Sequence, residues 1–195
     1  MLEVELKSVV DDWKVRRTAV EAAGASLTFE GHLQDRRYDT EERALATLDH
    51  VLRVRLYRDA TRTRAELDWK GPTRRENGYK LREELGSQIE DAESLVAILE
   101  RLGYVVTIAI DREIAQYDLD GAMVRFERYP RLDDLVEVEG TPEQIERAIG
   151  VLGLPRDGFT SDRLPDFARR FEERTGTRAL LSDTATDTDF DIANA

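Results

Sequence analysis

The first residues, MLEVELK, carry charged side chains at every second position. Glu3, Glu5 and Lys7 alternate there with two leucines and a valine. Successive side chains of a β-strand point to opposite faces, so this spacing predicts a strand with two carboxylates and an ammonium group on one face. A second pair of carboxylates, Glu137 and Glu139, has the same spacing in LVEVEG. Paired carboxylates offer the hard oxygen ligands that Mg²⁺ or Mn²⁺ prefer, although an ordinary sheet with one solvated face would show a similar pattern.

Basic residues follow the same alternation elsewhere in the chain. Arg53 and Arg55 share one face in VLRVRLY, and Lys80, Arg82 and Glu84 share one in YKLREEL. Several cations on one enclosed face would repel one another unless they bind an anion, and guanidinium groups match the geometry of phosphate. A polyphosphate with a bound metal ion would satisfy the acidic and the basic residues together.

Two periodicities indicate the elements that must position these residues. Alternating segments bounded by turn residues predict eight strands, near residues 1–7, 27–38, 51–57, 62–70, 79–85, 104–117, 121–128 and 133–140. Apolar residues at helical spacing, with acidic or Thr-Pro starts and glycine ends, predict four helices, over residues 11–23, 91–103, 141–150 and 164–176.

The two carboxylate pairs lie in the first and the last predicted strand, which suggests that these strands are neighbours in a closed sheet. We therefore predict an α+β fold, a closed eight-stranded antiparallel β-barrel with a polar lumen. The apolar strand faces would point outward, where the helices can cover them. We expect a domain over residues 1–178 and a polar, disordered tail over residues 179–195. The last helix could pack over one opening of the barrel or lie on the barrel exterior, and we favour the exterior.

Composition narrows the class of protein. The 195 residues fit one domain, and the formal net charge of −12 argues against generic binding to nucleic acid or to an anionic membrane. The sequence has no cysteine, which excludes disulfides, thiolate metal sites and a cysteine nucleophile. No segment has the pattern of a signal peptide or the length of an apolar membrane span. We expect a cytoplasmic monomer or homodimer whose partner is a small molecule that carries a polyphosphate group.

Together these motifs resemble those of the CYTH family, the triphosphate tunnel metalloenzymes, which includes class IV adenylate cyclases and thiamine triphosphatases. The resemblance rests on the initial Glu-x-Glu-x-Lys, DRRYD at 35–39, RVR at 53–55, WKGP at 69–72, REE at 82–84, DREIAQY at 111–117 and VEVE at 136–139. It implies an eight-stranded antiparallel tunnel that binds triphosphate compounds with a divalent metal.

The resemblance also implies roles for individual residues. The metal-side carboxylates would be Glu3, Glu5, Glu84, Glu137 and Glu139, and the phosphate-binding residues would be Lys7, Arg53, Arg55, Lys70, Arg82 and Arg112. Lys7 and Glu127 would lie nearest the reacting phosphoryl group. Three departures from the family pattern bear on substrate preference: Ile110 stands where a lysine is usual, Glu127 where an aspartate is usual, and Asp133 where a glycine usually follows the leucine.

Three functions are open at the level of sequence. The leading hypothesis is a phosphohydrolase, dependent on Mg²⁺ or Mn²⁺, that acts on inorganic triphosphate or on a triphosphorylated organic molecule. The second is class IV adenylate cyclase chemistry, in which the ribose 3′-hydroxyl of ATP attacks the α-phosphate and pyrophosphate leaves. The third is a non-catalytic binder of triphosphate or polyphosphate, which the loss of a cation at Ile110 would suit.

Overall fold

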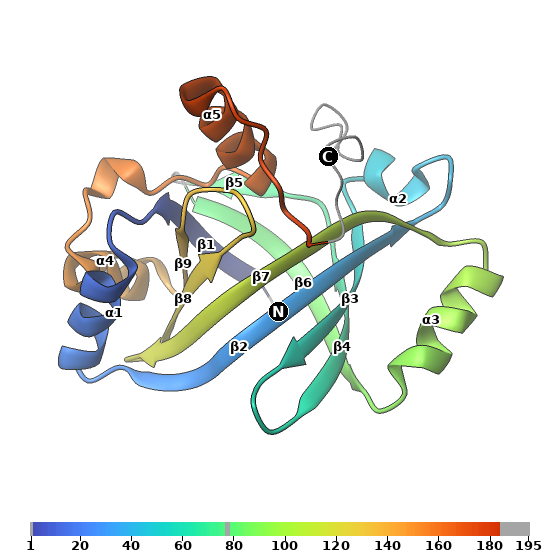
Figure 1. Cartoon of the computed structure of the whole chain (residues 1–195), viewed down its shortest axis with the longest axis horizontal. Helices are drawn as coiled ribbons and strands as arrows, with labels where there is room; N and C mark the ends of the chain where they lie inside the picture. The colour runs from blue at the N-terminus through green and yellow to red at the C-terminus, as the bar shows by residue number, and fades with distance from the viewer. Residues whose placement is uncertain (1, 77–78, 184–195) are drawn as a thin grey trace.

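The computed structural model describes residues 2–76 and 79–183, which form a barrel of strands with helices outside it (Figure 1). The strands are β1 (Leu2–Val9), β2 (Ser26–Asp39), β3 (Val51–Arg58), β4 (Thr63–Lys70), β5 (Arg74–Glu76), β6 (Tyr79–Ile89), β7 (Val105–Leu119), β8 (Ala122–Arg128) and β9 (Leu135–Glu139). The helices are α1 (Trp13–Ala22), α2 (Ala44–Thr47), α3 (Ala92–Arg101), α4 (Pro142–Leu152) and α5 (Leu164–Thr175), with a 3₁₀ turn, η1 (Arg156–Gly158). All predicted elements are present, and the short β5, α2 and η1 were not predicted.

Eight of the described strands close into a barrel, as the sequence predicted. Their hydrogen-bonded order is β1-β9-β8-β7-β2-β3-β4-β6, and antiparallel pairing of β6 with β1 completes the ring, while β5 pairs with the start of β6 outside it. Because β1 also pairs with β9, Glu5 faces Glu139 and Lys7 faces Glu137. The expected proximity of the first and the last strand is confirmed.

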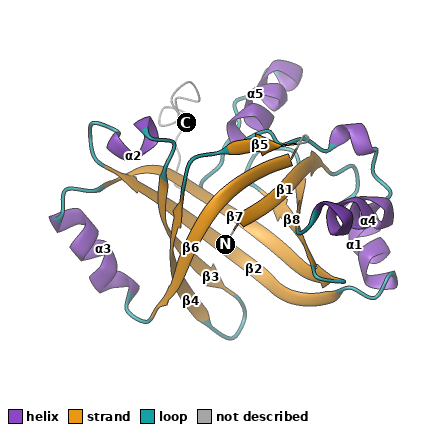
Figure 2. Cartoon of the chain, turned by 180° about the vertical axis from the view of Figure 1, so that it is seen from behind, coloured by secondary structure: helices purple, strands orange, loops and turns teal. Residues whose placement is uncertain are grey.

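The outward strand faces are apolar and lie under helices. Leu6, Val124 and Val138 are buried in one cluster with Val20 of α1 and Ile145 of α4. Figure 2 shows α1 and α4 together at this side of the barrel, with α3 on the opposite side. Burial of these apolar faces by helices leaves the charged faces of the same strands to point into the lumen.

Local sequence signals set the ends of the covering helices. The Asp12 carboxylate accepts hydrogen bonds from two backbone N–H groups at the start of α1. Thr141 and Gln144 form a capping box at the start of α4, and Gly153, at φ 64°, ends that helix in the left-handed region that glycine adopts without strain.

The C-terminal part differs from the prediction in two respects. Leu164 and Pro165, at the start of α5, line the cavity of the barrel, so this helix does not lie wholly on the exterior as expected. Downstream, Leu180 pairs with Arg131, and Leu181 is buried. The expected domain boundary at residue 178 is therefore too early. The remainder of the expected tail, residues 184–195, lies outside the described residues.

None of the helices in residues 2–76 and 79–183 combines the length and the apolar character needed to cross a membrane.

Candidate active site

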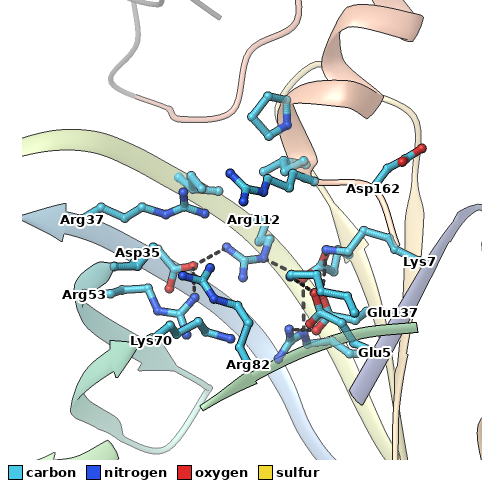
Figure 3. Close-up of a pocket in the computed structure, with 18 of the residues that line it drawn as sticks. Glu5, Lys7, Asp35, Arg37, Arg53, Lys70, Arg82, Arg112, Glu137 and Asp162 are labelled. Carbon is cyan, nitrogen blue, oxygen red and sulfur yellow. Dashed lines mark hydrogen bonds and ion pairs between the residues drawn. The ribbon is translucent and has the colours of Figure 1, made fainter. Parts of the chain in front are cut away.

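Charged side chains from the strands line one cavity inside the barrel (Figure 3). The lining includes all six residues that were predicted to bind phosphate, namely Lys7, Arg53, Arg55, Lys70, Arg82 and Arg112. It also includes four further basic residues, Arg37, Lys80, Arg125 and Arg163, and six acidic residues, Glu5, Asp35, Asp49, Glu127, Glu137 and Asp162. Ten basic and six acidic side chains give the lining a net formal charge of +4, within a chain whose net charge is −12.

Asp35 of β2 holds three arginines together in this cavity. Its carboxylate accepts hydrogen bonds from Arg55 Nε and Arg112 Nη1, each at 3.0 Å, and lies 3.7 Å from Arg53 Nη1. β2 lies between β3 and β7 in the barrel, which brings these side chains to one place. Burial alone would raise the pKa of Asp35, but the guanidinium groups hold this pKa well below its usual range. Asp35 is therefore ionised and orients the arginines around it.

Glu127 of β8 is the centre of a second cluster. Its Oε1 accepts hydrogen bonds from Arg112 Nε at 3.1 Å and Arg125 Nε at 3.2 Å, and its Oε2 accepts from the Tyr129 hydroxyl at 2.8 Å. Burial alone would raise the pKa of Glu127, but the surrounding cations, Lys7 first among them, lower it to about 2. Glu127 is a carboxylate at neutral pH.

Lys7 of β1 bridges two carboxylates. Its Nζ lies 3.0 Å from Glu127 Oε2 and 2.8 Å from Glu137 Oε2. Burial would lower the pKa of Lys7, but the two carboxylates outweigh it and raise this pKa above its ordinary value. Lys7 is protonated and Glu127 is ionised at neutral pH, so neither group has the pKa near neutrality that exchange of a proton with a substrate would require.

The predicted metal-side carboxylates gather on β1 and β9. Glu5 lines the cavity and pairs with Lys80, and Glu137 lines it from the neighbouring strand. Glu139 shares the inward face of β9 with Glu137 and lies opposite Glu5 in the strand register. Like charges that face each other across a strand pair are destabilising, and a cation bound between them would remove this cost.

The other two predicted metal ligands are placed differently. Glu84 pairs with Lys70 and does not line the cavity, and the side chain of Glu3 lies outside the described part of the structure. No group of three or more His, Cys, Asp or Glu side chains in the described ranges converges on one point. Glu5, Glu137 and Glu139 therefore offer the hard oxygen atoms that a divalent cation prefers, on neighbouring strands, without forming a converged three-ligand group.

Apolar side chains fill one end of the lumen. Leu33, Tyr57 and Ile114 extend the inward faces of β2, β3 and β7 by one alternation step past the arginine cluster, and they form a buried cluster with Phe29. We call these four residues the apolar plug. Arg64 covers it, with its guanidinium carbon 4.1 Å from the centre of the Tyr57 ring. The lumen is therefore polar over only part of its length.

The segment before α5 covers the other end of the lumen. Arg163 Nη2 donates to Asp49 Oδ1 at 3.0 Å and to Thr73 Oγ1 at 3.2 Å. These contacts connect α5 to the loops that precede β3 and β5. Four apolar residues, which we call the apolar collar, also line this end of the cavity: Val51, Ile110, Leu164 and Pro165.

Several lining residues were not nominated from the sequence. They are Asp35, Arg37, Asp49, Lys80, Arg125, Asp162 and Arg163. Alternation placed Lys80 on the charged face of its strand, beside Arg82, without assigning it a role in the site. Arg125 lies two residues from Glu127 on the same strand, so the same alternation places it on the charged face. The same holds for Asp35 and Arg37 within DRRYD. No sequence signal marks Arg163, because its position depends on how α5 folds back over the barrel.

Solved structures of other proteins share this architecture. A candidate adenylate cyclase from Vibrio parahaemolyticus superposes with a TM-score of 0.73 at 19% identity, over 86% of this chain and 97% of that one. The PH1012 protein of Pyrococcus horikoshii has a TM-score of 0.67 at 18% identity, over 85% and 98%. A Hippeastrum protein, described as a candidate adenylyl cyclase with a dominant triphosphatase activity, has a TM-score of 0.59 at 18% identity, over 92% and 98%. At these identities the likeness establishes the fold.

Family membership comes from a comparison of sequences. A search of curated proteins finds no significant match. The model of the CYTH domain, in contrast, matches residues 1–148. This range contains all nine strands of the described structure and every residue that was nominated for the site. The chain belongs to the CYTH family.

Proposed function

We propose that this protein is a phosphohydrolase, dependent on Mg²⁺ or Mn²⁺, that transfers the terminal phosphoryl group of a triphosphate to water. The excess of basic over acidic side chains around the cavity carries the proposal. In a chain with a net charge of −12, a cavity lining with a net charge of +4 would attract an anionic ligand. Binding of triphosphate substrates with a metal is also what membership of the family implies.

The arginines around Asp35 would bind the phosphate oxygens. Arg53, Arg55 and Arg112 each present several N–H donors in a planar array that suits phosphate. Asp35 holds these groups in place before the substrate arrives, which lowers the cost of organising them around the phosphates. An incoming polyphosphate would add to these contacts and compete with Asp35 for the same donors.

Charge at the reacting phosphoryl group would be stabilised from the other cluster. The Lys7 ammonium is fixed by Glu127 and Glu137, and it would offset negative charge on the transferring oxygens. Glu127 would act as a positioning residue, because its carboxylate holds Lys7 and Arg112 at once. A divalent cation, when held by Glu5, Glu137 and Glu139, would supply Lewis-acid polarisation of the phosphates.

A second candidate is adenylate cyclase chemistry. The apolar collar favours it, because apolar side chains at the open end of the cavity could contact the base of ATP. The structurally similar Hippeastrum protein supports the hydrolase proposal, since the dominant activity of that protein is described as that of a triphosphatase. Non-catalytic binding of triphosphate is the third alternative.

Product analysis separates these functions. The purified protein is incubated with tripolyphosphate, ATP or thiamine triphosphate and with Mg²⁺, Mn²⁺ or EDTA, and the products are identified by phosphorus NMR. The hydrolase proposal expects orthophosphate that depends on the metal. Cyclic AMP and pyrophosphate without orthophosphate would contradict it in favour of the cyclase, and tight binding without any product would leave only the binder.

Two variants connect any activity to the cavity. Arg112→Gln removes a donor that lies between Asp35 and Glu127, and we expect a loss of roughly 10²- to 10³-fold in kcat/KM. Arg128→Gln makes the same change on the neighbouring strand, where the side chain is 54% exposed and pairs with Asp134. Activity that survives the first substitution, or is equally reduced by both, would place the reaction elsewhere.

A further inference from the structure

One guanidinium group in the cavity has no acidic partner. Nine of the ten basic lining residues lie within 4.0 Å of a carboxylate in the described part of the chain. Arg37 is the exception: its side chain makes no hydrogen bond or ion pair there, and its Nε is buried without an acceptor. Carboxylates pair with the other nine basic residues of the cavity, whereas the positive charge of Arg37 has no carboxylate partner among the described residues.

The strand geometry directs Arg37 into the cavity. It lies two residues after Asp35 on the inward face of β2, on the side away from the apolar plug. The β2–β7 register shifts immediately after it, between Arg37 and Tyr38, and such irregularities re-aim side chains next to functional sites. Across the pair, Ile110 is the diagonal neighbour of Arg37 and also lines the cavity. Figure 3 shows Arg37 above Asp35 and Arg53, below the start of α5.

The surroundings of Arg37 disfavour its charge. Burial, followed by repulsion from Arg53, Arg112 and Arg82, lowers the pKa of Arg37 to about 10. The group is still protonated at neutral pH, and the fold bears the cost of keeping an unpaired charge partly desolvated. An anion bound between Arg37 and its cationic neighbours would reverse this cost.

We propose that Arg37 forms a phosphoryl subsite at the collar end of the cavity. Its ligand is a tetrahedral phosphate group with at least two free oxygens, held by a paired donor contact from the guanidinium. Arg37 thereby supplies, from β2, the positive charge that Ile110 does not supply from β7. The inference rests on the proposed triphosphate ligand, but it concerns binding and is independent of turnover.

Three variants test the subsite. Arg37→Gln removes the unpaired charge, and Arg37→Gln with Ile110→Lys moves a positive charge to the neighbouring strand. Arg36→Gln is the matched control: Arg36 is the adjacent residue, and it pairs with Asp111 at 2.7 Å instead of lining the cavity. Binding of tripolyphosphate, pyrophosphate and orthophosphate is measured by calorimetry in EDTA, and the Tm of each ligand-free protein is measured in parallel.

The expected results for the two single variants are opposite. Arg37→Gln weakens binding by roughly 10- to 100-fold, the value of a charge-assisted contact, and does not lower the ligand-free Tm. Arg36→Gln lowers the Tm and leaves binding unchanged. The double variant recovers part of the lost affinity.

Two results would overturn the subsite. One is an Arg37→Gln protein with the affinity of the unaltered chain, and the other is one whose Tm falls as in Arg36→Gln, which would indicate a structural role. A different result would contradict the proposed function alone: the unaltered protein would bind these phosphates but would release no product in the presence of metal. If it binds none of the three phosphates, both proposals fail.

Discussion

Replacement of Asp35 by asparagine tests whether the carboxylate at the centre of the cavity stabilises the fold at the expense of ligand binding. The side chain is 2% exposed and contacts three arginines, at 3.0, 3.0 and 3.7 Å. The substitution Asp35→Asn would keep the shape of the side chain but would leave these guanidinium groups without their shared counter-charge.

The expected loss follows from burial. Removal of one partner from a buried ion pair costs about 3–5 kcal/mol of unfolding free energy. For a chain of this length, 1 kcal/mol corresponds to roughly 2–4 °C, so Tm should fall by about 6–20 °C. The matched control is Asp133→Asn. In the unaltered protein the Asp133 carboxylate accepts two hydrogen bonds from the exposed Arg174, at 2.7 and 2.8 Å. An exposed pair of this kind contributes about 0–1 kcal/mol.

The assay combines thermal unfolding with ligand titration. Tripolyphosphate should raise the Tm of Asp35→Asn by more than that of the unaltered protein, because phosphate no longer competes with Asp35 for the arginines. Equal stability of Asp35→Asn and Asp133→Asn would refute the claim that the buried ion pairs stabilise the barrel. A smaller ligand-induced shift in Asp35→Asn would refute competition and would indicate that Asp35 mainly orients the arginines.

Three further outcomes follow from the site. The pKa of Glu127 falls from 4.5 to about 2 on folding, so its ionised form contributes about 3 kcal/mol at neutral pH. That contribution is present above the ordinary pKa of a glutamate and is lost as pH falls toward 2, so Glu127→Gln should flatten the acid side of the stability profile measured by urea unfolding. The apolar plug closes one end of the lumen, so tripolyphosphate should be bound or cleaved in preference to long polyphosphate chains. Equal rates of cleavage per chain end, measured by gel electrophoresis, would contradict this. Arg163→Gln removes a half-exposed ion pair between the start of α5 and Asp49. Ligand release, measured by stopped flow, should then be faster by up to about fivefold. An unchanged release rate would argue against a role of α5 at the open end of the cavity.

Alternation carried most of the fold prediction. In the first strand, Glu5 and Lys7 alternate with Leu6, and period two leaves only one arrangement in which the apolar residue reaches a core. The repeat of that pattern at Glu137 and Glu139 indicated that the first and the last strand are neighbours, as their register now shows. The helix starts at Asp12 and Thr141 could also be predicted from the sequence, because capping depends on residues within one turn of the helix.

Features that depend on contacts between residues far apart in the chain could not be predicted from the sequence. The start of α5 was expected outside the barrel, and its amphipathic pattern suits either position because an apolar stripe specifies burial without specifying the partner. The end of the folded chain was placed too early, because the polar composition after residue 178 hides the pairing of Leu180 with Arg131 and the burial of Leu181. Polar lumen residues were expected throughout, whereas the apolar plug fills one end.

The sequence by itself determined which residues of a strand share a face, because side-chain direction along a strand follows from period two alone. It also determined that the lumen would hold both signs of charge. Only the tertiary structure decided which charges neutralise one another: Asp35 is shared by three arginines, and Arg37, two residues away on the same face, has none of these contacts. The physical reason is that ion pairing requires approach within a few ångströms, and this approach is set by the register of neighbouring strands and by closure of the barrel.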